Sequence, residues 1–156
     1  MPAQLSQAGT ARIVLILALG LGCSAQAAAK GFKGALPGKT TRTQVIDKFG
    51  DPSREITKGG KLSDGLAYEG EEAISGSLVT NFFFDKHGIL FRIDVYPARE
   101  LTRAQVIRVY GPGFRAGATG QGDKYIQYPA DGLIVFFEKD ADRARVFLFS
   151  EPGQDG

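Results

Sequence analysis

The sequence is poor in the residues that bind metals or attack substrates. Its 156 residues include one cysteine, Cys23, and one histidine, His87. A zinc or copper site takes about four ligands, mostly Cys and His. A Ser-His-Asp arrangement would have to use His87, which stands in a stretch typical of a hairpin turn, and no G-x-S-x-G motif accompanies it. We therefore expect no metal site, no catalytic residue, no cofactor and no enzymatic activity.

Net charge is also small, because 19 Lys and Arg stand against 17 Asp and Glu. A nucleic-acid-binding protein needs many cationic contacts with phosphates, and no run of Lys or Arg indicates a polybasic membrane patch. We expect no nucleic-acid partner. Acidic residues cluster at Glu69, Glu71 and Glu72. This cluster is typical of a solvated loop tip, with a weak calcium site as the alternative.

Long apolar segments are lacking too. The longest run, residues 13–22, is shorter than the roughly 20 residues that span a bilayer. It follows Arg12 and precedes small residues, which is the pattern of an export signal over residues 1–29. Cleavage after Ala27 or before Lys30 would fit this pattern. We expect an exported protein, located in the periplasm, at the periplasmic face of the outer membrane, or secreted.

Cys23 offers an alternative to simple cleavage. The segment L-G-L-G-C that ends at Cys23 resembles a lipobox, the signal for acylating a cysteine and anchoring it in a bacterial membrane. The departure from that pattern is Gly20, where Leu is usual. Membrane attachment is expected only through this anchor.

The remaining sequence contains a repeated motif. Residues 41–50 read T-R-T-Q-V-I-D-K-F-G, and residues 102–111 read T-R-A-Q-V-I-R-V-Y-G, with six of ten positions identical. Each copy predicts a short helix. A threonine is placed to cap its start, with Gln three residues later, and a glycine followed by proline ends it.

Strand-like runs follow each predicted helix. They are bounded by turn residues and rich in aromatic and β-branched side chains, at residues 66–68, 78–84, 89–96, 125–128, 133–137 and 144–149, with 53–58 and 113–118 as further candidates. We predict an α+β fold in which two repeats, about 36–98 and 99–152, share one curved antiparallel sheet with the helices on one face. They would form a single domain over residues 30–152, with a flexible tail at 153–156.

Strand alternation separates the two faces of such a sheet. If the aliphatic set packs under the helices, the other face carries aromatic and arginine side chains, a composition typical of protein interfaces. The alternative is that the N-terminal arm or another segment covers this face. The predicted partner-binding residues are Phe83, Arg92, Tyr96, Phe136, Arg145, Phe147 and Phe149.

The motif G-K-T-T-R-T-Q-V-I-D-K-F-G-D-P, with the F-F-F-D-K-H-G-I-L hairpin after it, resembles the SmpA/OmlA (BamE-like) family of outer-membrane assembly lipoproteins. The doubled form is similar to the β-lactamase inhibitor protein, a tandem arrangement called the BLIP-like fold. The resemblance implies a non-enzymatic cell-envelope protein that binds protein partners and supports outer-membrane assembly or envelope integrity. An inhibitor of an exported enzyme is the alternative, and an unrecognised enzyme a distant one.

Overall fold

A computed structural model describes residues 30–58 and 62–153. The expected export signal, both cleavage positions and Cys23 lie outside these residues, apart from Lys30 itself, as does the expected tail beyond Gly153. The elements in chain order are α1 (Arg42–Phe49), β1 (Arg54–Lys58), β2 (Leu62–Glu69), the 3-10 turn η1 (Gly70–Glu72), β3 (Ser77–Phe84), β4 (Leu90–Pro97), α2 (Arg103–Tyr110), β5 (Arg115–Ala118), β6 (Lys124–Tyr128), the 3-10 turn η2 (Pro129–Asp131), β7 (Leu133–Phe137) and β8 (Ala144–Ser150).

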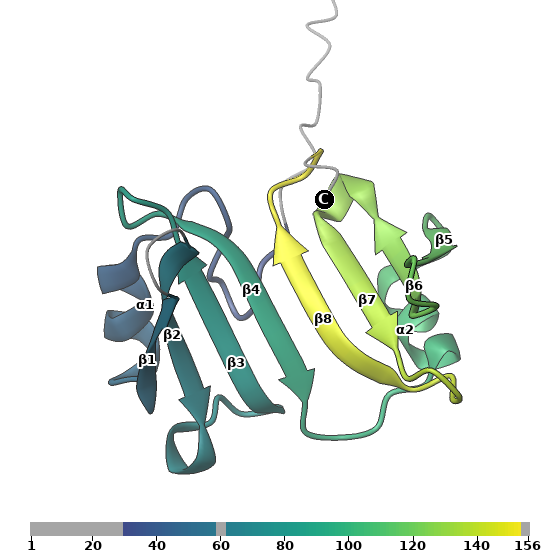
Figure 1. Cartoon of the computed structure of the whole chain (residues 1–156), viewed down its shortest axis with the longest axis horizontal. Coiled ribbons are helices and arrows are strands. Elements are labelled where there is room, and N and C mark those ends of the chain that lie inside the picture. Colours follow the sequence, from purple (N-terminus) through teal and green to yellow (C-terminus); the bar gives the residue numbers. More distant parts are fainter. Residues whose placement is uncertain (1–29, 59–61, 154–156) are drawn as a thin grey trace, which may run out of the picture.

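The strands form one eight-stranded antiparallel sheet in the order β1-β2-β3-β4-β8-β7-β6-β5 (Figure 1). The fold is therefore α+β, as predicted. The two further candidate segments, 53–58 and 113–118, contain the edge strands β1 and β5. At the centre of the sheet β4 pairs with β8, which joins residues far apart in the sequence.

Both helices begin and end as the motif predicts. The hydroxyl of Thr41 accepts a hydrogen bond from the backbone N–H of Gln44, and that of Thr102 from Gln105, in complete capping boxes. Gly50 and Gly111 follow the helices with φ of 84° and 90°, a region that favours glycine. Each helix buries one valine in the core, so helices this short are held by packing on the sheet.

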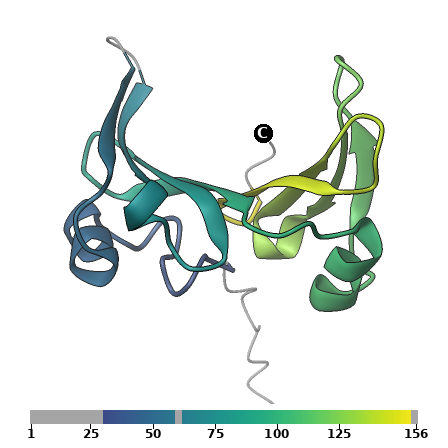
Figure 2. The same cartoon turned by 90° about the horizontal axis from the view of Figure 1, so that it is seen from below.

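The helices lie on the same face of the sheet, and the sheet curves away from them at both edges (Figure 2). The arm before α1 also lies on the helix side, where Ala35 is fully buried and the ring of Phe32 is 6.4 Å from that of Phe149. The opposite face is concave and faces the viewer in Figure 1. Within the described ranges, no helix has the length and apolar character needed to cross a membrane.

Candidate functional site

The concave side of the sheet, which we call the open face, is the surface that no helix covers. Register fixes its members, since residues paired across strands point to the same side. It carries Asn81, Phe83, Arg92, Asp94 and Tyr96 in one part, and Tyr125, Gln127, Ile134, Phe136, Val146 and Leu148 in the other.

Four predicted partner-binding residues lie on this face: Phe83, Arg92, Tyr96 and Phe136. Tyr96 is 36% exposed, and the other three are half-buried. Arg145 is exposed in β8, where the pairing with β7 is irregular, and its guanidinium is 3.8 Å from the carboxylate of Asp123. The structure thus brings most of the predicted set to one side of the sheet.

Phe147 and Phe149 are the exceptions, because they do not lie on the open face as expected. They are 6% and 4% exposed and belong to the core on the helix side. The ring of Phe147 lies 6.3 Å from that of Tyr110 in α2. Both phenylalanines pair with buried residues of β4, namely Val95 and Ile93.

The length of the β7–β8 turn and the bulge after it explain why these two residues lie on the other face. Phe84 pairs with Leu90 and Phe137 with Ala144, so the turn spans 85–89 in the first hairpin and 138–143 in the second, one residue longer. Each hairpin also has a bulge directly after its turn. The expected faces follow from continuous alternation through β8, whereas a bulge shifts the register by one residue and moves every later side chain to the other face.

Other residues that sequence reasoning did not select also lie on the open face. Leu148 pairs with Asp94 on one side and Ile134 on the other, and Val146 pairs with Phe136. Tyr125 also pairs with Phe136, with ring centroids 5.6 Å apart. Ala144 and Phe147 are both buried although they are three positions apart, a spacing that a bulge permits and simple alternation does not.

The first part of the open face is polar and internally paired. Arg92 donates from Nε and Nη2 to the two carboxylate oxygens of Asp94, at 2.7 and 2.6 Å. This hydrogen bonding raises the pKa of Arg92, so the guanidinium stays charged. The guanidinium also lies 5.2 Å from the ring centroid of Phe83. Beside Asp94, the side-chain oxygen of Asn81 is buried and has no hydrogen-bond partner among the described residues.

The second part is apolar and hollowed. A cavity of about 510 Å³ opens there, between the centre of the sheet and the β5–β6 loop. Gly117 of β5 gives space for the ring of Tyr125, because a Cβ at that position would come within 2.5 Å of it. The lining residues are Phe91, Arg92, Ala118, Thr119, Tyr125, Gln127, Ile134, Phe136, Leu148 and Ser150.

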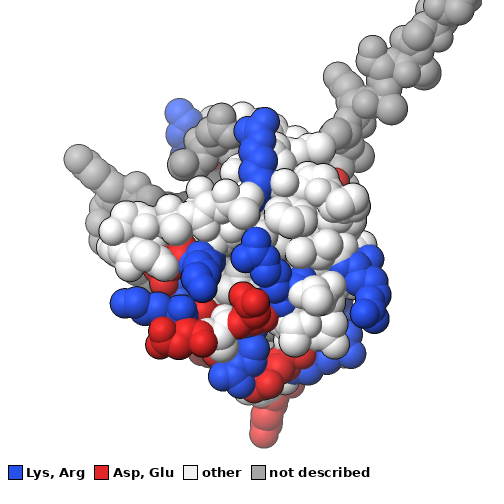
Figure 3. Space-filling model, turned by 90° about the vertical axis from the view of Figure 1, so that its right-hand side faces the viewer, with Lys and Arg blue, Asp and Glu red and all other residues white. Residues whose placement is uncertain are grey.

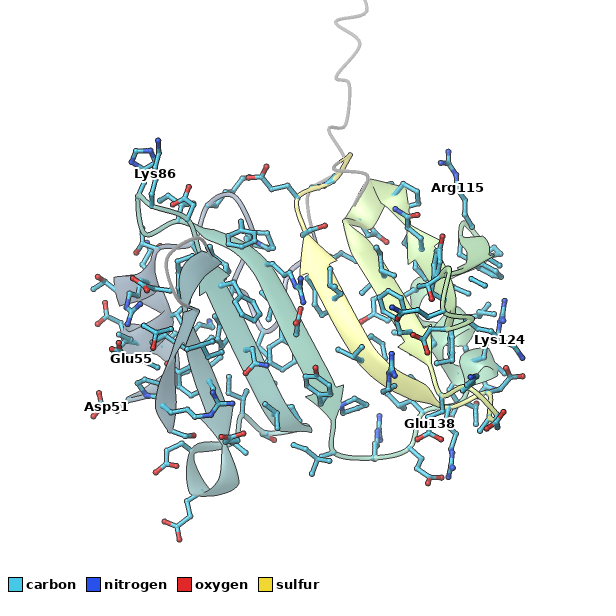
Figure 4. The ribbon with its side chains drawn as sticks, in the orientation of Figure 1. Asp51, Glu55, Lys86, Arg115, Lys124 and Glu138 are labelled. Atoms are coloured by element: carbon cyan, nitrogen blue, oxygen red, sulfur yellow. The ribbon has the colours of Figure 1, made fainter. Side chains whose placement is uncertain are left out.

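Apart from the Arg92–Asp94 pair at the centre of the sheet, charged residues are also present at its periphery. The labelled side chains, from Asp51 and Glu55 at one edge of the sheet to Lys124 and Glu138 near the other, point outward from it (Figure 4). Seen from the β5 side, charges of both signs crowd the lower part, and the area above them is mostly uncharged but carries separate basic side chains (Figure 3).

The other sequence candidates do not form a site in the described ranges. Arg54 Nε donates to Glu69 at 2.8 Å, while Glu71 and Glu72 are exposed in η1. No group of three or more His, Cys, Asp or Glu side chains there could hold a metal ion. His87 is exposed in the β3–β4 turn, where its backbone N–H donates to Asp85.

Comparison with known proteins adds a likeness of fold. No protein-family model matches the chain, and no curated protein matches it in sequence. Among solved structures, it is similar to YjgB, a DUF4309 family protein from Bacillus subtilis, with a TM-score of 0.56 and 16% identity, over 76% of this chain and 82% of that one. At this identity the likeness concerns the fold alone.

Proposed function

We propose that the protein is a non-enzymatic cell-envelope protein that binds protein partners through the open face. The observation that carries this proposal is the apolar part of that face, where half-buried Ile134, Phe136 and Leu148 line a hollow on a concave sheet. Soluble proteins rarely leave such contiguous apolar surface without a use. A concave sheet also suits a convex partner, because matching shapes bury more area.

The envelope assignment is part of the same proposal and rests on the sequence. The export signal and the resemblance to the SmpA/OmlA family support a role in outer-membrane assembly or envelope integrity, with Cys23 as the anchoring residue if it is acylated. We further propose that the domain arose as two copies of one unit. In support, each half begins with a capped helix followed by four strands.

Inhibition of an exported enzyme is the second candidate. The concave shape of the open face favours it (Figure 2), since such a surface can cover the mouth of an active site. The two candidates differ in attachment, because an assembly factor needs an anchor and an inhibitor can diffuse. Intact mass and membrane partitioning of the protein from its native cells separate them: a diacylated Cys23 in the membrane fraction supports the first, and a soluble form cleaved before residue 28 or 30 supports the second.

Binding itself is tested by cross-linking in native cells. A photo-reactive residue at position 136 should form covalent adducts with a defined protein partner, and the same residue at Asp47, which is exposed on α1, serves as the matched control. Adducts that arise equally from both positions, or from neither, would contradict binding through the open face.

A further inference from the structure

A second hollow lies on the helix side of the sheet, away from the open face. It has a volume of about 220 Å³ and is bounded by α2, the centre of the sheet, the β4–α2 connection and the arm before α1. Its lining includes Val95 and Phe149 of the sheet, Leu101 of the connection and Val109 of α2. Because side chains alternate along a strand, Asp94 and Leu148, the chain neighbours of Val95 and Phe149, point to the open face. The two hollows are therefore separate sites.

Its size favours a single inserted side chain. Pockets that enclose a drug-sized molecule measure roughly 300–1,000 Å³, which is more than this hollow offers. Val109 is 74% exposed at the rim and extends the apolar surface onto α2. Anchoring of one large apolar side chain in a small pocket is typical of the energetic centres of protein interfaces.

The charges at the rim favour an acidic partner. Arg99 lines the hollow, and Lys33 Nζ lies 6.0 Å from the ring centroid of Phe32, which also lines it. The ion pairs among the described residues are formed by other cations, so neither Arg99 nor Lys33 has an acidic partner there. The nearby carboxylate of Glu100 is bound by Arg143. Helix α2 has no acidic residue.

We infer that this helix-side hollow docks an acidic segment of a protein partner, which inserts one Leu or Phe side chain between α2 and the sheet while its carboxylates contact Arg99 and Lys33. The protein would then have two binding faces and could hold two partners at once. This inference does not depend on the proposed function of the open face.

The test uses the ¹⁵N-labelled protein and two synthetic peptides, Asp-Asp-Leu-Phe-Asp-Asp and Lys-Lys-Leu-Phe-Lys-Lys. The acidic peptide should shift the amide signals of Leu101 and Val109, and the basic one should not. Arg99→Glu should weaken binding of the acidic peptide by roughly tenfold, since attraction becomes repulsion. Val109→Ser should also weaken it, through lost apolar contact.

Arg108→Glu is the matched control, because it makes the same change of charge on α2 at a residue that does not line the hollow. It should leave the affinity within about twofold of the original protein. Phe136→Ala, on the open face, should also leave peptide binding unchanged. Loss of binding at the helix-side hollow is thereby distinguished from loss of binding at the open face.

Three results would overturn the inference: no shifts at the hollow with the acidic peptide, equal shifts with the basic peptide, or equal losses in the Arg99 and Arg108 variants. Shifts produced by decanoate but not by either peptide would assign the hollow to an acyl chain and likewise overturn it.

Discussion

The two halves of the domain, residues 36–98 and 99–152, use the same contacts beneath the sheet. In the first half the hydroxyl of Tyr68 donates to the carbonyl of Gly50, and in the second that of Tyr128 donates to Gly111, both at 2.9 Å. Each bond ties a strand to the glycine that ends a helix. On the helix side of both halves, these bonds therefore help to hold in place a short helix that is unstable alone.

The open faces of the halves differ. Counted from the paired tyrosines, the positions of Asn81 and Asp94 in the first half correspond to those of Ile134 and Leu148 in the second. Two polar residues of the first half thus correspond to two apolar residues of the second. If the open face binds a partner as proposed, the apolar part in the second half is where we expect the largest contribution to binding.

The largest expected effect separates the two sides of the sheet. Phe147→Ala should lower the free energy of unfolding by about 3–5 kcal/mol, because it leaves a cavity in the core under α2. Phe136→Ala, on the open face, should cost much less stability and instead weaken partner binding. Urea unfolding of both variants measures the difference. Equal destabilisation would mean that Phe136 is also a core residue.

This pair of phenylalanines also shows what could be predicted from the sequence. Both helices and the open-face positions of Phe83 and Phe136 followed from capping residues and alternation, which are local. The side taken by Phe147 and Phe149 did not, because it depends on where a bulge falls after a turn that is one residue longer. The bulge in β8 is set by its register with β7 across that turn, which the alternation of apolar residues along one strand does not determine.

The helix caps should respond equally in the two halves. Thr41→Ala and Thr102→Ala each remove a hydroxyl that accepts a backbone N–H of the first turn. Each change should cost about 1 kcal/mol of unfolding free energy, with Thr→Ser as the control that retains the hydroxyl. A cost in only one half would show that the other helix is held by packing alone.

The tyrosine bonds should give a similar or smaller effect that depends on pH. Tyr68→Phe and Tyr128→Phe should each cost about 1 kcal/mol at neutral pH. Burial raises the pKa of both hydroxyls above the ordinary value of 10.0. As pH rises through 10, the two tyrosine hydroxyls therefore lose their protons in the unfolded chain before they do so in the folded protein. The free energy of unfolding falls above that pH. Each Phe variant should reduce this alkaline loss, as followed by thermal unfolding between pH 8 and 11.

The smallest expected effect lies in the β-hairpin turns, which the two halves stabilise differently. In the first, the Asp85 carboxylate accepts hydrogen bonds from the backbone N–H groups of Ile89 and His87, and these lower its pKa below 3.8. In the second, Arg143 binds Glu138 and Glu100 instead.

The carboxylate of Asp85 is thus stabilised by folding, and its contribution is present above pH 3.8 and lost as pH falls through the lowered pKa. Asp85→Asn should make the stability of the first turn less sensitive to acid between pH 5 and 2. It should leave the dependence of that stability on salt unchanged. Arg143→Gln should make the stability of the second turn less sensitive to salt, because exposed ion pairs are screened by salt. It should leave the dependence on acid unchanged. Amide hydrogen exchange at the two turns, measured across pH and ionic strength, distinguishes them. If both turns loosen together under either change, the hairpins open as one unit rather than as two independently stabilised turns.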